Sequence, residues 1–295
     1  MYFILDMPIS LDCIICLTRQ SLEAARFACC DELRHTAVLK RTLDLVYNKG
    51  FTTIPPLIAQ EIQRIVRDET GNTDPYSVQK QEFNNLMLSV REPLRQRIRG
   101  SEEPIRMAVQ LAIAGNAVDY AVRADWNQTM VLDTIEAALK QPINGNIEPF
   151  IESIVHSQNI LYLLDNCGEI ICDQLLIEEL QRFQPKLNVT AVVRGAAVLN
   201  DVTWTDVYQV GLDQSVTVID NGNDAVGTVL EQCGSEFQEK FKQTDLIIAK
   251  GLANYETLIE YDRKVLPQTV YYFFKAKCPF IARFAGVQLG DLVIR

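Results

Sequence analysis

The segment Asn159-Ile160-Leu161-Tyr162-Leu163-Leu164-Asp165-Asn166-Cys167-Gly168-Glu169 decides the fold of this chain. Its first six residues are mostly apolar and predict a buried strand, and the polar residues and glycine that follow predict a turn. A helix is expected over residues 173–183, directly after this turn. Strand, turn and helix in this order are typical of a parallel sheet, in which ligands bind beyond the carboxyl ends of the strands. The segment therefore predicts both the type of sheet and the place of a site.

The rest of the second half repeats this pattern. Apolar runs at residues 188–193, 216–219, 245–249 and 269–274 predict further strands, and the run 289–294 is expected to add an edge strand. Helices are expected at 225–232, 237–243 and 255–265. Continuous apolar strands that alternate with helices indicate a mostly parallel sheet covered on both faces. We therefore expect a Rossmann-like αβα domain over residues 151–295.

In the first half of the chain, the apolar residues recur with the spacing of helices. Residues 76–99 form a long amphipathic segment, which Pro93 is expected to bend or split. Residues 104–114 predict a further helix that ends at Gly115. Alternating runs of β-branched residues are scarce here, so the pattern indicates an all-helical domain over residues 1–150. The predicted fold class is α/β, with this helical domain beside the sheet.

Composition narrows the class of protein. The chain has 295 residues, of which 48% are hydrophobic and 22% charged, and this is typical of a soluble globular protein with two domains. The N-terminus carries Asp6 without a basic region, so no secretory signal is expected. Eight dispersed cysteines favour reduced thiols and a cytoplasmic location. A net charge of −10 argues against a nucleic-acid-binding face, and no apolar run approaches the roughly 20 residues of a membrane span.

Polar residues follow the predicted strands at several places. Asp165 and Asn166 follow the first strand, Arg194 and then Asp201 follow the second, and Lys250 ends a later one. Carboxylate and amide oxygens suit Mg²⁺ or Mn²⁺, and the two cations suit a phosphate. Each pattern alone is also typical of a helix cap or a solvated turn. Their joint occurrence favours one site for a metal and a phosphate.

Two further polar patterns have competing interpretations. Asn116 and Asp119 would share one face of a helix, although Asn116 could instead cap a helix start. Gly227-Thr228 could open a helix whose free N–H groups hold an anion, although such runs are more often turns.

Cys13 and Cys16 have the spacing of a metal or redox motif. A zinc site would need a second pair, and Cys29-Cys30 has poor spacing for it. The two cysteines are therefore expected to pack structurally or to bind a separate metal, and to take no part in the chemistry.

Taken together, these motifs resemble the metal-dependent damage-control phosphatases, a family first catalogued as a domain of unknown function. The resemblance covers nearly the whole chain in the same order, and the extra cysteines resemble the microbial branch. The matching elements are Cys13-x-x-Cys16, Gly115-Asn116-x-x-Asp119, Asp165-Asn166-x-Gly168-Glu169, Arg194-Gly195 with Asn200-Asp201-Val202-Thr203, and Lys250-Gly251-x-x-Asn254-Tyr255-Glu256.

The resemblance implies hydrolysis of phosphate monoesters of small metabolites, such as sugar phosphates or phosphopantetheine-like compounds, some of them damaged. It implies a divalent cation (Mg, Mn, Ni or Co) and a metal-binding role for Asp165, Asn166 and Asp201. The phosphate-contacting lysine of the family corresponds to Lys250. The remaining assignments follow from position beside these groups: catalytic roles for Asp165, Glu169, Asn116 and Asp119, and substrate contacts from Arg194, Asn254 and Gly168.

The attacking group is either water or Asp165. Water is favoured, because a carboxylate that ligates the metal is poorly placed to attack in line. Two other functions compete: an S-adenosylmethionine-dependent carboxyl methyltransferase on the same sheet, and a non-catalytic metabolite-binding protein. The first has been attributed to a eukaryotic branch of the family, but no separate glycine-rich cofactor loop is present in this sequence.

Overall fold

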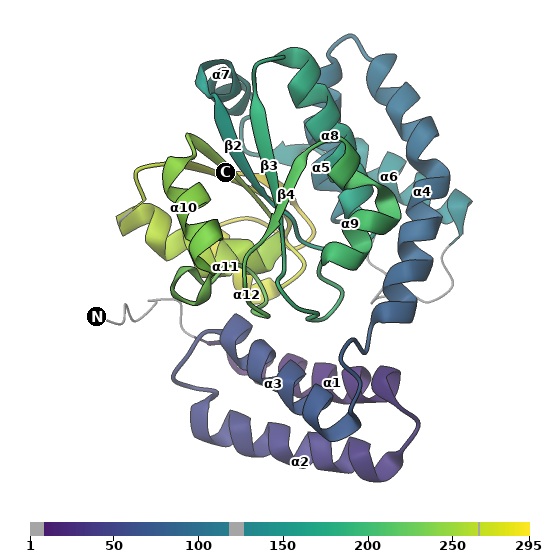
Figure 1. Ribbon diagram of the computed structural model, residues 1–295, viewed down its shortest axis with the longest axis vertical. Helices are drawn as coiled ribbons and strands as arrows, with labels where there is room; N and C mark the ends of the chain where they lie inside the picture. Colours follow the sequence, from purple (N-terminus) through teal and green to yellow (C-terminus); the bar gives the residue numbers. More distant parts are fainter. Residues whose placement is uncertain (1–8, 118–126, 265) are drawn as a thin grey trace.

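A computed structural model describes residues 9–117, 127–264 and 266–295 (Figure 1). Its helices are α1 (Leu11–Ala28), α2 (Glu32–Lys49), α3 (Pro55–Thr70), α4 (Ser77–Arg99), α5 (Pro104–Gly115), α6 (Gln128–Leu139), α7 (Glu148–His156), α8 (Glu169–Phe183), α9 (Trp204–Val210), α10 (Ser235–Gln243), α11 (Gly251–Lys264) and α12 (Pro279–Ala285). Within these residues, no helix is both long and apolar enough to cross a membrane.

Seven strands form one sheet in the order β1-β7-β6-β5-β2-β3-β4. They are β1 (Ile143–Asn144), β2 (Asn159–Leu163), β3 (Asn188–Val193), β4 (Thr217–Asp220), β5 (Leu246–Lys250), β6 (Thr269–Lys275) and β7 (Leu292–Ile294). Neighbouring strands are parallel except β6 and β7. The predicted α/β fold class with a mostly parallel sheet is confirmed. The expected edge strand at 289–294 is wrong in its position, because β7 lies between β6 and the short strand β1.

Alternate residues of β2 face opposite sides of the sheet. Ile160 and Tyr162 join a core with α4, α5, α6 and α8, whereas Leu161 and Leu163 join a second core with α10, α11 and α12. Both sides of β2 are therefore apolar, and burial of each such side chain stabilises the fold by about 1.5–3 kcal/mol. Helices α4–α6 pack in the same core as the sheet. The core is therefore continuous across residue 150, where the spacing of apolar residues in the sequence changes. The division of the chain there stays a prediction.

Helix α4 runs without interruption through Pro93. Val90 and Leu94, on either side of this proline, are both buried in the core beneath the helix. The expectation that Pro93 splits the segment is wrong, because the apolar contacts of the whole helix outweigh the one lost backbone hydrogen bond.

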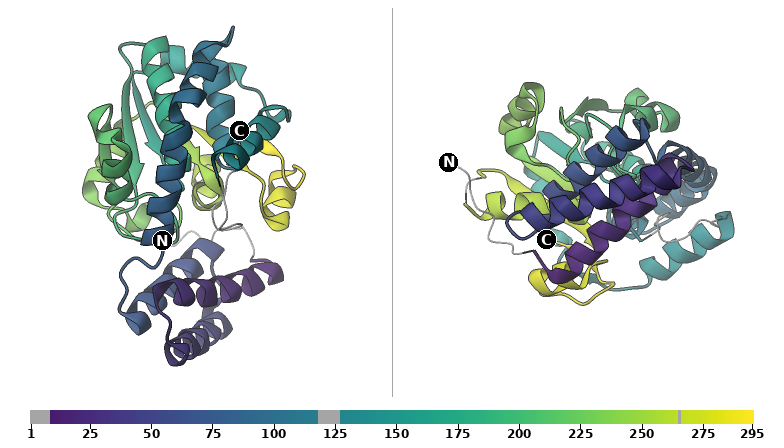
Figure 2. Two further views of the ribbon diagram at one scale, coloured as in Figure 1. Left: turned by 90° about the vertical axis from the view of Figure 1, so that its right-hand side faces the viewer. Right: turned by 90° about the horizontal axis from the view of Figure 1, so that it is seen from below.

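Helices α1–α3 form a separate layer at the carboxyl ends of the strands (Figures 1 and 2). Ile58 and Ile62 of α3 share a small apolar core with Val198 and Val226, from the loops that follow β3 and β4. The guanidinium of Arg67 also donates to the carbonyl of Ala197 over 2.8 Å. The layer thus covers the end of the sheet where ligands bind in α/β folds.

Asp224 fixes this layer to the loop after β4. Its carboxylate accepts hydrogen bonds from Arg64 at 2.5 Å, from Gln60 at 2.9 Å and from Arg67. Burial opposes the charge, but Arg64, Gln60 and Arg67 together lower the pKa of Asp224 to about 2. The ionised carboxylate therefore stabilises the folded chain.

Replacing Asp224 with asparagine is expected to lower the free energy of unfolding at pH 7 by ~1–2 kcal/mol, since Arg64 is half exposed. The folded pKa lies below the unfolded value near 3.9, so this contribution is complete above the unfolded pKa. It is lost as the pH falls toward 2. Urea unfolding of both proteins between pH 7 and pH 3 should show the gap closing with acid. A gap that stays constant or widens would contradict the assignment.

The helix expected over 225–232 is wrong, since only a short 3₁₀ turn, Leu230–Gln232, lies within it. Gly227 has φ +84°, and a Cβ there would lie 2.4 Å from the carbonyl oxygen of Ala253. The N–H of Thr228 donates to the Thr257 hydroxyl over 2.9 Å. This N–H is therefore not a free anion-binding group at a helix start.

Candidate metal and phosphate site

The site lies where the order of strands changes direction. Strands β3 and β4 lie on one side of β2 in the sheet, and β5 and β6 lie on its other side. Leu163 pairs with Val192 and with Ala249, so Asp165, Arg194 and Gly251 stand level two residues further on. This is the switch point at which α/β sheets bind ligands.

Gly251 lets the Asp165 carboxylate approach the end of β5. Its φ is +78°, and a Cβ at this position would lie 1.9 Å from Oδ2 of Asp165. Any other residue would displace the carboxylate. The Lys250-Gly251 element therefore needs its glycine for close packing at the site.

Backbone hydrogen bonds join the loop after β2 to the loop after β3. Val202 donates to the carbonyl of Asp165 and Cys167 donates to the carbonyl of Asn200, both over 2.9 Å. Asn166 and Asp201 form an isolated antiparallel bridge. These bonds bring together the three residues predicted to hold a metal (Asp165, Asn166 and Asp201).

Two side-chain amides orient the carboxylates. Nδ2 of Asn116 donates to Asp165 over 3.2 Å and to Glu169 over 2.7 Å. Nδ2 of Asn166 donates to the same two carboxylates over 2.5 and 3.3 Å. The Asn166 oxygen takes no part in these bonds.

Asn116 reaches this site from the last turn of α5. It lies after the helix as its C-cap, not at a helix start as one interpretation of the sequence had it. Its oxygen accepts the N–H of Lys275 over 3.1 Å. The structure thus places Asn116 among the predicted site residues, whereas Asp119 lies outside the described residues.

Lys250 is held inside the chain. Its ammonium donates to Glu169 over 2.5 Å, to Asp173 over 2.6 Å and to the carbonyl of Ala112 over 2.8 Å. Burial opposes the charge of this fully buried group, but Asp173 and then Glu169 outweigh it and raise the pKa of Lys250. All three ammonium protons have acceptors within the chain. The role of Lys250 as a phosphate contact stays a prediction.

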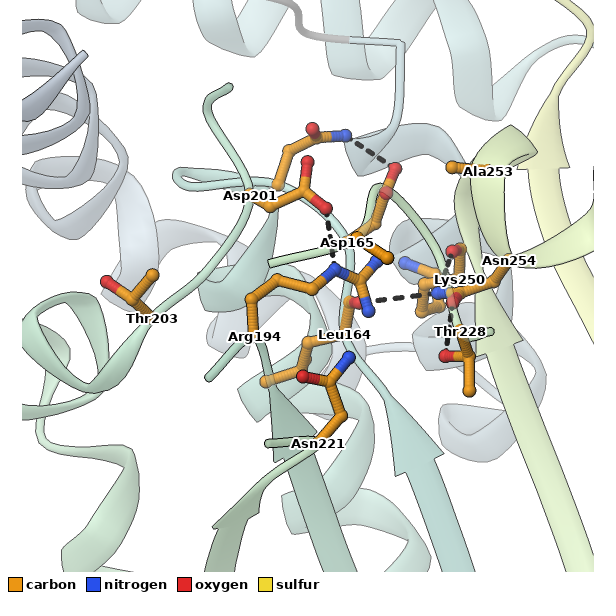
Figure 3. A network of polar contacts seen from close by, with 12 residues as sticks. Leu164, Asp165, Arg194, Asp201, Thr203, Asn221, Thr228, Lys250, Ala253 and Asn254 are labelled. Carbon is orange, nitrogen blue, oxygen red and sulfur yellow. Dashed lines mark hydrogen bonds and ion pairs between the residues drawn. The ribbon is translucent and has the colours of Figure 1, made fainter. Parts of the chain in front are cut away.

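Arg194 makes a second buried ion pair. Its Nε donates to Oδ2 of Asp201 over 2.7 Å, and both side chains are buried (Figure 3). Such a contact orients a carboxylate whose other oxygen can ligate a metal.

Negative charge exceeds positive charge among these buried groups. Four buried carboxylates (Asp165, Glu169, Asp173 and Asp201) face two buried cations, Lys250 and Arg194. Burial, and then Glu169 and Asp201, raise the pKa of Asp165 well above its ordinary value. Burial also raises the pKa of Asp173 to about 7, and that of Asp201 despite Arg194. Full ionisation of all four carboxylates would leave two negative charges in excess, which a divalent cation would balance.

The donor atoms fit a hard cation. Asp165, Asn166 and Asp201 offer only oxygen, which suits Mg²⁺ or Mn²⁺ better than softer metals. In the described ranges, no group of three or more His, Cys, Asp or Glu side chains is arranged so that it could hold a metal ion. The candidate set has two carboxylates and the amide oxygen of Asn166.

Asn84 of α4 links the loop after β2 to the first turn of α9. Its Oδ1 accepts the N–H of Gly168 over 2.7 Å, and its Nδ2 donates to Asp206 over 2.9 Å. Asp206 in turn accepts the N–H of Thr203 over 2.9 Å and pairs with Lys80 at 2.7 Å. The backbone N–H of Gly168, whose φ is +72°, is therefore already hydrogen-bonded within the protein.

Replacing Asn84 with alanine is expected to weaken Mn²⁺ binding by about tenfold, because outer residues that orient ligands contribute on this scale. The N–H of Gly168 would lose its acceptor, so stability should fall by ~1–3 kcal/mol. Calorimetric titration with Mn²⁺ measures the affinity. Asn85→Ala, at an exposed neighbouring position, is the control. If a folded Asn84→Ala protein bound Mn²⁺ with unchanged affinity, Asn84 would contribute to the packing of the fold and not to metal binding.

The other predicted substrate residue, Asn254, is fully buried on α11. Its Nδ2 donates to the carbonyl of Lys250 over 2.7 Å, and its Oδ1 accepts from Thr228 over 2.8 Å (Figure 3). These bonds link the loop after β4 to the start of α11. A direct substrate contact from Asn254 stays a prediction.

Asp173, Asn84 and Lys80 were not expected at the site. Asp173 has a signal in the sequence, since it follows Glu169 by four residues and the three residues between them are apolar. Asn84 and Lys80 have none, because only the packing of α4 against the loops brings them there.

The cysteines at 13 and 16 lie on α1, where Cys13 is buried and Cys16 is exposed. Burial raises the pKa of the Cys13 thiol, which keeps it protonated at neutral pH. The double variant Cys13→Ser/Cys16→Ser is expected to keep its metal-dependent turnover per folded molecule. A folded double variant without turnover at saturating metal would place these thiols in the chemistry.

Comparison with known proteins agrees with this architecture. The family model of the damage-control phosphatase ARMT1-like domain matches residues 9–293. An uncharacterized protein of Methanocaldococcus jannaschii is 33% identical over 98% of this chain and 95% of its own length. A damage-control phosphatase of Archaeoglobus fulgidus is 31% identical over 98% of this chain and 99% of its own.

A solved structure is similar over the same extent. The crystal structure of a DUF89 family protein from Pyrococcus horikoshii matches with a TM-score of 0.88 and 28% identity, over 97% of this chain and 98% of that one. The family predicted from the motifs is confirmed, and this chain belongs to the ARMT1-like damage-control phosphatase family.

Proposed function

We propose that this protein is a metal-dependent phosphatase that hydrolyses phosphate monoesters of small metabolites. The observation that carries the proposal is the cluster of buried side-chain oxygens at the switch point of the sheet, where four carboxylates lie with two cations. The names of the relatives support a phosphatase of damaged metabolites. Sugar phosphates and phosphopantetheine-like compounds are the substrate classes to test first.

Asp165, Asn166 and Asp201 would hold the cation. When bound, a divalent cation offsets the charge of a phosphoryl oxygen and lowers the pKa of a coordinated water. The residues of the chain supply the positioning that phosphoryl transfer requires. Asn116 and Asn166 keep the carboxylates of Asp165 and Glu169 side by side.

Glu169 is the residue best placed to orient a water. One of its oxygens accepts from Lys250 over 2.5 Å and the other from Asn116 over 2.7 Å. It is therefore fixed next to Asp165 and does not depend on the metal for its position. Asp165 itself remains a ligand, and water remains the preferred attacking group.

A screen of cations against a panel of phosphate esters tests the proposal. Phosphate release that requires Mg²⁺, Mn²⁺, Ni²⁺ or Co²⁺ and stops with a chelator would support it. Binding of S-adenosylmethionine without phosphate release would instead favour the methyltransferase. Thermal shifts by metabolites without turnover under any cation would favour a binding protein.

A further inference from the structure

Two buried polar side chains stand next to each other at the ends of β3 and β4. Val193 pairs with Asp220 in the parallel register, so the next residues along, Arg194 and Asn221, are neighbours. Arg194 is 1% exposed and Asn221 is 0% exposed. In Figure 3 the nitrogen of the Asn221 side chain points toward the Arg194 guanidinium.

The orientation of the Asn221 amide is fixed by its oxygen. This Oδ1 accepts the N–H of Gly195 over 3.0 Å and the N–H of Asn223 over 3.2 Å. A flipped amide would lose both hydrogen bonds. Nδ2 of Asn221 therefore faces the guanidinium as a donor.

Three nitrogens of this pair lack acceptors. Nε of Arg194 donates to Asp201, but Nη1 and Nη2 have no partner among the described residues, and neither has Nδ2 of Asn221. Buried donors without acceptors carry a free-energy penalty and are rare in native proteins. Adjacent donors of this kind, one group of them cationic, match an acceptor that has several oxygens and a negative charge.

We propose that Arg194 and Asn221 form an anion-binding subsite for the phosphoryl group and for the inorganic phosphate product. This inference rests on the proposed function. The same guanidinium orients Asp201, so the subsite lies directly beside the candidate metal ligands. The ammonium protons of Lys250 all have acceptors within the chain, whereas two guanidinium nitrogens of Arg194 have none among the described residues.

The loops after β3 and β4, which carry Arg194 and Asn221, are both tied to α3. Arg67 of α3 holds the first loop at Ala197, and Asp224 holds the second to α3. The three nitrogens are shielded from solvent, so binding of an anion requires these loops to shift.

The variant Asn221→Asp distinguishes a loss of anion binding from a loss of stability. The carboxylate keeps acceptors for Gly195 and Asn223 and also offers an acceptor to Arg194. The ligand-free variant is therefore expected to unfold at a higher temperature than the parent protein. Inorganic phosphate should bind to it at least about tenfold more weakly, since the donor is replaced by a negative charge.

Calorimetric titration of the Mn²⁺-loaded proteins with inorganic phosphate measures the affinity, and product inhibition gives a second value where turnover is found. Asn223→Asp is the matched control: it adds the same charge two residues away, where Nδ2 lies 3.5 Å from the sulfur of Cys233. The control should change the phosphate affinity by less than about threefold. Asn221→Ser removes the donor without adding charge and should weaken phosphate binding by about threefold.

A more stable Asn221→Asp protein with weakened phosphate binding supports the subsite. Equal phosphate affinity in the parent, Asn221→Asp and Asn221→Ser proteins overturns it and leaves a water site. A parent that binds phosphate through Asn221 but hydrolyses no ester would retain the subsite and reject the proposed function. Hydrolysis without any effect of Asn221 would do the reverse.

Discussion

Metal-free protein that carries Asp165→Asn is expected to be more stable than the parent by about 1–2 kcal/mol at pH 7. The substitution removes a buried carboxyl group whose ionised form is disfavoured, while keeping an oxygen for the amides of Asn116 and Asn166. With metal present, the same variant is expected to lose about 10³-fold in activity, because several kcal/mol of charge stabilisation are withdrawn.

The stability gain should depend on pH in a defined direction. The folded pKa of Asp165 is raised, so the folded chain binds this proton more tightly than the unfolded chain. The parent therefore loses stability as the pH rises above about 4, and the advantage of Asp165→Asn grows. Urea unfolding in chelator at several pH values measures it. Asp213→Asn, at an exposed carboxylate, is the control. A metal-free Asp165→Asn protein that is less stable than the parent would show that ionised Asp165 does not destabilise the folded chain.

Lys250→Met is expected to destabilise the protein by ~3–5 kcal/mol, because it leaves Glu169 and Asp173 buried without their cation. Adding Asp173→Asn should restore about half of the loss by removing one unpaired charge. Lys186→Met, on an exposed turn, is the control. Urea unfolding of the parent, Lys250→Met, Asp173→Asn and the double variant gives the interaction energy.

The kinetics of folded Lys250→Met protein test the other role of this lysine. A higher KM together with a lower kcat would support the phosphate contact that the family resemblance implies. A loss of stability below about 1 kcal/mol would contradict the buried ion pairs instead.

The strand ends were predictable because they depend on local sequence. Asp165, Asn166 and Lys250 directly follow or end apolar runs, and parallel strands bring their carboxyl ends to one edge. The family resemblance added Asn116 from the first half. Its contact with Glu169 and Asp165 depends on α5 packing against α8, which no local pattern expresses.

Tertiary contacts explain what was not predicted. The buried side chains of α4 pack in the same core as the sheet, whereas those of α1–α3 pack in two separate small cores. The loop around Gly227 is set by contact with Ala253, which overrides its helical pattern. Helix α9 had a local signal in the sequence, the capping box of Thr203 and Asp206. Three further helices (α6, α7 and α12) and strand β1 were also absent from the expectations.

Titration of the chelator-stripped protein with Mn²⁺, followed as phosphate release from the best ester of the panel, tests the central claim most directly. The account predicts no release from the stripped protein and recovery that saturates near one Mn²⁺ per chain. Asp201→Asn should need a far higher Mn²⁺ concentration for the same recovery. Phosphate release that survives stripping, or that responds to Mn²⁺ equally in the parent and in Asp201→Asn, would contradict it.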